Sequence, residues 1–286
     1  MSRSRVLAGA AFVALLSAGT AWRAEAAINE IDIGINPTFT QSGPTTVTAT
    51  GGFFAARAFL DSSGDFNGGT LTWPGAMSPQ PLALEADPLF PVLGYSFDDS
   101  NLADLNTQFP FGTYTFTAPF SGSSPGQTES LSYTETADAL STPTLDADTF
   151  NGLQDLRASS GFTFNFNTFE QSLTPGASGL VFLSVSNSSG VSVFSTDGLD
   201  ASTTSVFMPG NTLKAGQDYT FDLLFDERIS GSNGDVPTTL FFDSHTDGSF
   251  STAVPEPATW TMMILGFGGL GLTLRRRASK TKGAFA

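Results

Sequence analysis

Apolar and polar residues alternate along most of the chain between residues 28 and 254. In the segment 219–226 the odd positions are Tyr, Phe, Leu and Phe, and most of the even positions are polar. A period of two places successive side chains on opposite faces of a strand, so one face lies on a core and the other meets water. The same alternation occurs at 114–117, 162–167 and 181–185. The pattern predicts an all-β protein built from half-buried antiparallel strands.

Turn-forming pairs separate these predicted strands, because Gly, Pro, Asn and Asp supply the backbone conformations that tight turns need. No convincing amphipathic helix is found between the two ends of the chain, although residues 98–108 are long enough for a turn or two. The predicted turns are Asn151-Gly152, Pro175-Gly176, Asp197-Gly198, Pro209-Gly210 and Asp247-Gly248.

The chain has no cysteine, so no disulfide can stabilise it. Its stability must come from apolar burial, and 27 Phe residues with an aromatic fraction of 12% provide the material. That aromatic content also excludes a disordered stalk. We expect a folded body with an aromatic core.

A short motif recurs in the two halves of this body. Two segments place a Gly-containing turn before Tyr-Thr-Phe, and their tyrosines are Tyr114 and Tyr219. The spacing is close to the length of one sandwich domain, roughly 100 residues. We therefore predict two tandem antiparallel β-sandwich domains, residues 27–140 and 141–253, joined at Ser141–Thr144. A single larger jelly roll is the alternative, because sandwiches of roughly 200 to 250 residues occur as one domain.

The second copy of the motif resembles the entry to strand F of fibronectin type III and related immunoglobulin-like sandwiches. In that family a Leu and a Gly precede a corner tyrosine whose hydroxyl bonds back to the backbone. Ala215 stands where such domains often have Pro, and Phe164 or Phe166 would replace the core Trp of strand C. The matching residues are Leu213, Gly216 and Tyr219.

Residues 1–26 have the organisation of a secretory signal peptide. Arg3 and Arg5 form a basic region, an apolar run follows at 6–18, and Ala24-Glu25-Ala26 offers small residues for cleavage before Ala27. The apolar run is too short for a permanent membrane helix. We expect export across the inner membrane followed by removal of this segment.

The C-terminal end carries a second hydrophobic segment. Residues 258–274 contain no charge, and three arginines follow. This length is at the short end of what spans a bilayer as a helix, where roughly 20 residues are typical. The positive-inside bias places the arginines and the cytoplasmic tail 278–286 inside, and everything before Pro255 outside. Trp260 lies where an aromatic belt residue would meet the outer interface.

The segment 254–277 also resembles the PEP-CTERM sorting signal. It has the Pro-Glu-Pro triplet, a Trp three residues later, a Gly-rich apolar run and an arginine cluster. Thr261 stands where the family often has Ala, and nine residues follow the last arginine. The matching residues are Pro255, Glu256, Pro257, Trp260, Arg275, Arg276 and Arg277.

The resemblance implies a bacterial protein that is anchored transiently in the inner membrane by its C-terminal helix. A membrane transpeptidase of the exosortase type would then cleave it near the triplet, which is a substrate and not a catalyst. The protein would end on the cell surface or outside the cell. The family is associated with exopolysaccharide-producing bacteria, so a role in the envelope or extracellular matrix is implied.

The body between the two terminal segments is strongly acidic. Of the 27 Asp and Glu in the chain, all except Glu25 and Glu256 lie in residues 28–254, and only four basic residues accompany them. The difference between 25 acidic and 4 basic residues is a net charge of −21, against −15 for the whole chain. A field of this sign repels phosphate polymers, so nucleic acid is excluded as a partner. The four basic residues are Arg57, Arg157, Lys214 and Arg228.

Little in the body points to catalysis. His245 is the only histidine, and its neighbours Asp243 and Ser244 cannot form a local Ser-His-Asp relay, because adjacent side chains on a strand point to opposite faces. The chain lacks the motifs of hydrolase nucleophiles, phosphate loops and zinc helices. A hydrolase with two carboxylates roughly 5 to 10 Å apart is a lesser alternative. We expect a non-catalytic protein that needs no cofactor.

Two binding functions remain as alternatives. The segments 61–68 and 146–152 place Asp, Asn and Ser oxygens on predicted loops, and such oxygens suit structural calcium, although neither segment fits the EF-hand pattern. A carbohydrate-binding module would use Trp73, Tyr95 or Tyr133 to dock on exopolysaccharide, unless these aromatics belong to the core.

Overall fold

The computed structural model describes most of the body. The predicted signal peptide 1–26 lies outside the described residues, and so does the predicted membrane helix 258–274 except for Leu265 and Phe267, which are helical and exposed. Among the described residues, no helix is long and apolar enough to cross a bilayer. The described residues are 28–61, 68–85, 91–119, 126–133, 140–154, 156–170, 176–254, 265 and 267.

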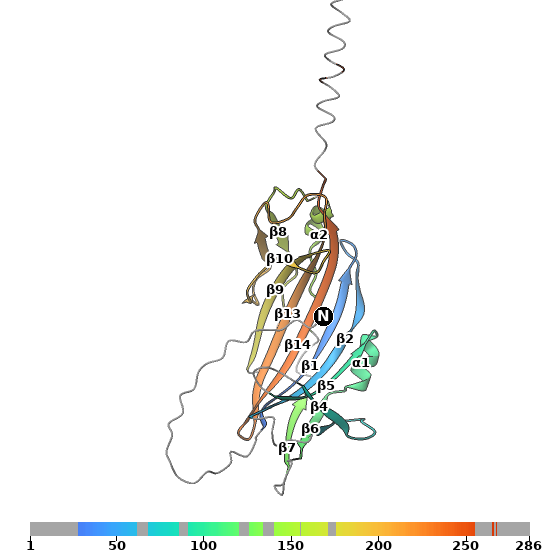
Figure 1. Ribbon diagram of the computed structural model, residues 1–286, viewed down its shortest axis with the longest axis vertical. Helices are drawn as coiled ribbons and strands as arrows, with labels where there is room; N and C mark the ends of the chain where they lie inside the picture. The colour runs from blue at the N-terminus through green and yellow to red at the C-terminus, as the bar shows by residue number, and fades with distance from the viewer. Residues whose placement is uncertain are drawn as a thin grey trace, which may run out of the picture.

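Fourteen strands and two short helices make up the described body, which confirms the all-β prediction (Figure 1). The helices are α1 (Leu102–Gln108) and α2 (Ala147–Gln154). The strands are β1 (Ile28–Gln41), β2 (Val47–Leu60), β3 (Gly69–Thr72), β4 (Gln80–Glu85), β5 (Val92–Asp99), β6 (Gly112–Ala118), β7 (Gln127–Tyr133), β8 (Phe162–Asn165), β9 (Ala177–Asn187), β10 (Ser192–Ser195), β11 (Leu199–Asp200), β12 (Ser205–Met208), β13 (Asp218–Asn233) and β14 (Val236–Ser251).

Twelve strands form one sheet in the order β10-β9-β13-β14-β1-β2-β5-β4-β3-β6-β7, with β11 also paired to β9. The ribbon β8-β12 stands apart. The described pairings are antiparallel except that of β1 with β14, which is parallel from Ile31 opposite Thr238 to Thr40 opposite Asp247. The sheet is therefore mixed, whereas purely antiparallel pairing was predicted. Two parallel neighbouring strands need a long connection, and here the chain from β2 to β13 connects β1 to β14.

The sheet folds back on itself, so that β7 lies over β1 and the hairpin β13–β14. The Ile28 amide donates to Gln127 Oε1 at 2.8 Å, and Asn233 Nδ2 donates to Glu129 Oε2 at 2.9 Å. Between the two layers lies the first core, in which the rings of Phe54 and Phe109 stack with centroids 4.0 Å apart. Two β layers around an aromatic core form the predicted sandwich.

A second core lies at the other end of the long strands, where β9, β13 and β14 pass beneath α2 and the ribbon β8-β12 (Figure 1). The predicted strand 219–226 buries Tyr219, Phe221, Leu223 and Phe225 here, as its alternation requires. Phe164 and Phe166, the proposed replacements for the strand C Trp, belong to the same core.

Buried polar residues separate the two cores. Glu227 lies on β13 between Phe225 of the second core and Ile229 of the first, and its side chain is fully buried. On the neighbouring strand, Ser244 and Thr246 are also fully buried. Apolar packing is therefore interrupted in the middle of the long strands while their hydrogen bonds continue.

The two cores draw mainly on different halves of the chain. Nearly all of the first core comes from residues before 134, and the second comes from residues after 144. One sheet nevertheless runs through both halves by way of the β1–β14 pairing. The structure thus has two cores along one continuous sheet, and the division into two separately folding domains stays a prediction.

In both copies of the Tyr-Thr-Phe motif the tyrosine hydroxyl bonds back to the preceding backbone. Tyr219 Oη accepts a hydrogen bond from the Lys214 amide at 2.8 Å, as the corner-tyrosine resemblance implies. Tyr114 Oη donates to the Pro110 carbonyl oxygen at 2.9 Å. Both hydroxyls therefore bond to backbone four or five residues upstream and hold the turn before the strand.

Two of the predicted turns are wrong. Asn151-Gly152 lies inside α2, whose preceding residue Asp146 accepts a hydrogen bond from the Thr149 amide at 2.7 Å, the pattern of a helix N-cap. Asp247-Gly248 lies inside β14, where the Phe221 ring of the paired strand covers the glycine. A Cβ on Gly248 would be 2.5 Å from that ring, so glycine is required for packing and not for a turn.

Replacing Tyr219 by Phe should lower the free energy of unfolding by about 1 kcal/mol, because the Lys214 amide loses its acceptor while the ring stays in place. Tyr114→Phe should lower the free energy of unfolding by a similar amount, because the Pro110 carbonyl oxygen loses its donor. Denaturant unfolding would measure both. Tyr95→Phe is the control, since its hydroxyl makes no hydrogen bond with a described residue. Equal stability of all three variants would contradict the corner assignment.

Candidate functional site

The last strand, β14, ends at the start of the segment that resembles a sorting signal. Thr252 follows the strand and is only 3% exposed. Its amide donates to the Gln217 carbonyl oxygen at 3.0 Å, its hydroxyl accepts from the Gln217 amide at 3.1 Å and donates to the Lys214 carbonyl oxygen at 2.7 Å. The Ala253 amide then donates to the Leu156 carbonyl oxygen at 2.9 Å. We call these five residues the exit clamp.

The exit clamp is attached to the second core through the corner tyrosine. Tyr219 fixes the Lys214 amide, and its ring stacks on Phe250 of β14 with centroids 5.7 Å apart. Gly216 forms the turn between them with φ of 66°, a conformation that favours glycine. These contacts hold the backbone of residues 214–217 in place beside Thr252.

The body ends immediately after the exit clamp. Val254 is 72% exposed. The predicted sorting residues Pro255, Glu256, Pro257, Trp260, Arg275, Arg276 and Arg277 lie outside the described residues. Of the residues that the structure describes, Ala253 is the last with a hydrogen bond to the body, and it lies two positions before the triplet.

The aromatics proposed for carbohydrate binding pack in the first core. Tyr133 is 1% exposed and stacks on Phe242, and burial raises the pKa of its hydroxyl. Trp73 donates its indole N–H to the Gln108 carbonyl oxygen at 2.8 Å and lies parallel to the ring of Tyr114. Tyr95 is half-buried against Trp73. These three residues form core contacts and not an exposed platform.

The two segments proposed for calcium have different structures. Asp146 is the N-cap of α2, so its carboxylate already accepts a backbone hydrogen bond. Asp61 accepts a hydrogen bond from the Asn29 side chain, and residues 62–67 lie outside the described residues. In the described part of the chain, no group of three or more acidic or histidine side chains could hold a metal ion.

His245 lies within β14 and is half-buried. Its Nδ1 is 3.4 Å from Asp222 Oδ1 on the paired strand β13. Asp243 and Ser244, its neighbours in sequence, are buried. The histidine thus pairs with a carboxylate across the sheet, a partner that local sequence could not indicate.

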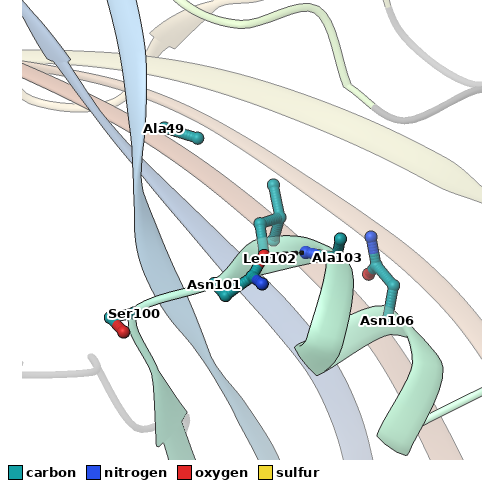
Figure 2. Close-up of a pocket in the computed structure, with 6 residues that line it drawn as sticks. All are labelled: Ala49, Ser100, Asn101, Leu102, Ala103 and Asn106. Atoms are coloured by element: carbon teal, nitrogen blue, oxygen red, sulfur yellow. Dashed lines mark hydrogen bonds between the residues drawn. The ribbon is translucent and has the colours of Figure 1, made fainter.

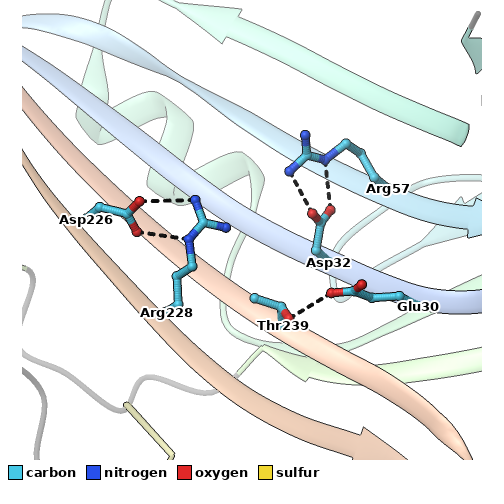
Figure 3. A network of polar contacts seen from close by, with 6 residues as sticks. All are labelled: Glu30, Asp32, Arg57, Asp226, Arg228 and Thr239. Carbon is cyan, nitrogen blue, oxygen red and sulfur yellow. Dashed lines mark hydrogen bonds and ion pairs between the residues drawn. The ribbon is translucent and has the colours of Figure 1, made fainter. Parts of the chain in front are cut away.

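Two arginines form ion pairs on the outer face of the sheet (Figure 3). Arg57 Nε and Nη2 donate to the two oxygens of Asp32 at 2.9 and 2.6 Å. Arg228 lies 3.1 Å from the Asp226 carboxylate, and both guanidinium groups lie over the ring of Phe241. Burial raises the pKa of Asp32, and Arg57 opposes this by stabilising the charged form. Arg57 and Asp32 neutralise each other across the paired strands β1 and β2, whereas Arg228 and Asp226 pair along the single strand β13. Neither pair was predicted from the sequence.

An open pocket of about 450 Å³ lies beside the start of α1 (Figure 2). Asn101, one of its three polar residues, is the N-cap of the helix, accepting from the Ala103 amide at 3.1 Å and donating to Asp104 at 2.8 Å. None of the six lining residues is ionisable, so their side chains offer no general acid or base. The lining residues are Ala49, Ser100, Asn101, Leu102, Ala103 and Asn106.

Replacing Thr252 by Val should release the end of the chain from the body. The variant keeps the shape of the side chain but leaves the Gln217 amide and the Lys214 carbonyl without the hydroxyl. An unmade buried hydrogen bond costs about 1 to 3 kcal/mol, so the amides of residues 252 and 253 should exchange with deuterium roughly tenfold faster or more. Thr252→Ser keeps the hydroxyl and should exchange like the parent. Unchanged exchange in the Val variant would contradict the exit clamp.

Comparison with known proteins identifies the segment that follows the clamp. Residues 253–277 match the PEP-CTERM protein-sorting motif. The comparison with curated proteins gave no match. Among solved structures, the FN1–FN3 domains of chicken CNTN1 match with 9% identity over 74% of this chain and 67% of that chain, at a TM-score of 0.27. The BSP domain of a biofilm associated protein matches with 12% identity over 78% of this chain but only 30% of that chain, at a TM-score of 0.21. The protein is thus an exported β-protein that carries a PEP-CTERM sorting motif at the end of its fold.

Proposed function

We propose that the protein is a non-catalytic component of the bacterial envelope or extracellular matrix, released to its final place by exosortase-type cleavage near the Pro-Glu-Pro triplet. The proposal rests on one observation: the sorting motif begins at the residue where hydrogen bonding of the described body ends. The sorting motif begins at Ala253, and among the described residues Ala253 is also the last with a backbone hydrogen bond to the body. Cleavage after this point would leave the fold and its exit clamp complete.

The two prolines of the triplet are compatible with a position outside the sheet. Proline has no backbone N–H and cannot continue the hydrogen bonding of a strand, so Pro255 and Pro257 prevent β14 from extending into the motif. A peptide that enters a transpeptidase must be free of the body it belongs to. The exit clamp and the two prolines together define where the free peptide starts.

The acidic body is proposed to be cargo and not an enzyme. The ionic groups described above have structural partners, since Asp32 and Asp226 bind arginines and Asp146 caps a helix. A net charge of −21 over residues 28–254 keeps such a body soluble and separate from anionic polymers. No observation favours exopolysaccharide binding through Trp73 or Tyr133, because both pack in the core.

The intact mass of the protein recovered from its own host tests this function. In cells with the transpeptidase, we expect a chain that starts near Ala27 and ends near the triplet; in cells without it, the arginine tail should remain. The variant Pro255→Ala/Glu256→Ala/Pro257→Ala should also keep its tail in normal cells. Thr261→Ala is the matched control inside the motif, and it should be cleaved normally. A retained tail in normal cells would make the protein a permanently anchored envelope protein.

A further inference from the structure

Two of the four basic residues of the body lie at the exit of the chain. Of the four basic residues in 28–254, Arg57 and Arg228 are in ion pairs with aspartates on the outer face of the sheet. Arg157 and Lys214 are exposed and form no ion pair with a described residue. Arg157 follows Leu156, whose carbonyl oxygen binds Ala253, and the Lys214 carbonyl oxygen binds Thr252. Both cations therefore flank the exit clamp, in a body that is otherwise strongly acidic.

Two exposed apolar side chains accompany these cations. Val254 is 72% exposed and lies beside Gly216. Phe207 of β12 is 63% exposed, and its ring lies against Gly161. The loop 156–161 is joined to the end of β12 by the hydrogen bond from the Asn211 amide to the Ala158 carbonyl oxygen at 2.7 Å. We call Arg157, Phe207, Lys214 and Val254 the exit face.

In the membrane-anchored precursor of the proposed function, only a short connection separates the exit face from the membrane. Only Pro255, Glu256 and Pro257 separate Val254 from the apolar segment that begins at Ala258. The four Cα–Cα steps from Val254 to Ala258 span at most about 14 Å when extended. The Debye length is about 10 Å at 0.1 M salt, so charges at this distance from an anionic surface are only partly screened. An acidic body held so near is repelled less when exposed cations are among the charges nearest to the membrane.

We propose that the exit face rests on the anionic phospholipid headgroups of the membrane in which the tail is inserted. Arg157 and Lys214 contact lipid phosphates, and Phe207 and Val254 enter the interface between headgroups and acyl chains. The acidic remainder of the body then points away from the membrane along the length of β14. This contact fixes the triplet at the level of the headgroups, where a membrane transpeptidase reaches it. The inference rests on the proposed function, because it requires the tail to be inserted.

Single fluorescent labels test the contact directly. The chain has no cysteine, so one introduced cysteine gives one label. Ser160→Cys reports on the exit face, and Ser232→Cys reports on the far end of the hairpin, since both serines are exposed. Leu265→Cys reports on the tail. The full chain without its signal peptide is placed in phosphatidylglycerol vesicles that contain spin-labelled lipids, and quenching of each label is measured.

We expect the label at 265 to be quenched by deep spin labels, the label at 160 by headgroup spin labels, and the label at 232 by neither. In the 160-labelled protein, Arg157→Gln/Lys214→Gln should shift the docking equilibrium by roughly thirtyfold and abolish most of the quenching. Met77→Glu/Ser232→Glu lowers the net charge equally at exposed positions away from the exit and should leave quenching unchanged. Replacing phosphatidylglycerol by phosphatidylcholine in the vesicles should reduce quenching of the label at 160, as the glutamine substitutions do.

Two results would overturn the inference, and they have different meanings. If the label at 265 is quenched while those at 160 and 232 behave alike, the tail is inserted but the exit face does not rest on lipid. The same conclusion follows if quenching at 160 is unaffected by the glutamine substitutions. If the label at 265 is not quenched, the tail does not insert, and the proposed function fails together with the inference.

Discussion

The parallel pairing of β1 with β14 is the interaction on which the rest of the structure depends. It joins the first and last strands of the body over the register from Ile31 opposite Thr238 to Thr40 opposite Asp247. Without it, the sheet would divide into β2 and its neighbours on one side and β13 and its neighbours on the other. The two cores are separated by buried polar groups such as Glu227, so apolar packing alone does not connect them. Backbone hydrogen bonds through the centre of the sheet provide that connection.

This arrangement couples folding to the position of the sorting motif. The strand that completes the centre of the sheet is also the last described one before the motif, so the body cannot close until residues 236–251 are available for pairing. Such a long-range pairing forms slowly, because distant segments must meet before it contributes stability. Thr252 and Ala253 then attach the chain end to the loops of the second core. The same residues that finish the fold therefore set where the sorting motif leaves the body.

Local patterns in the sequence predicted local structure well. Alternation located β6, β8, β9 and β13, and the Leu-Gly-Tyr pattern predicted the hydroxyl bond that Tyr219 makes with the backbone. Helix α2 was missed because its Thr, Asn and Gly are poor helix formers, although Asp146 three residues before Thr149 was an available N-cap signal. Asp247-Gly248 has turn composition but lies in a strand, since Phe221 needs a residue without a side chain opposite it.

Of the candidate site, too, only the part that depends on local sequence could be predicted. The sorting motif was recognisable from its residues alone, because an export signal is read as a linear peptide. The exit clamp was not, since Thr252 binds Lys214 and Gln217 more than thirty positions away in sequence. The Arg57–Asp32 pair likewise depends on the register of β1 against β2, whereas Arg228 pairs with Asp226 on the same strand. Arg157 and Lys214 form no ion pair with a described residue, and both lie beside the exit clamp.

Native-state hydrogen exchange of the body tests the central claim, that β1 and β14 join both cores and the exit clamp into one cooperative unit. The account predicts that amides of residues 31–40 and 238–247 exchange at the same slow rate, through global unfolding, and that both cores share one denaturant dependence. Faster exchange of β1 than of β14, or two separate unfolding transitions for the two cores, would contradict it.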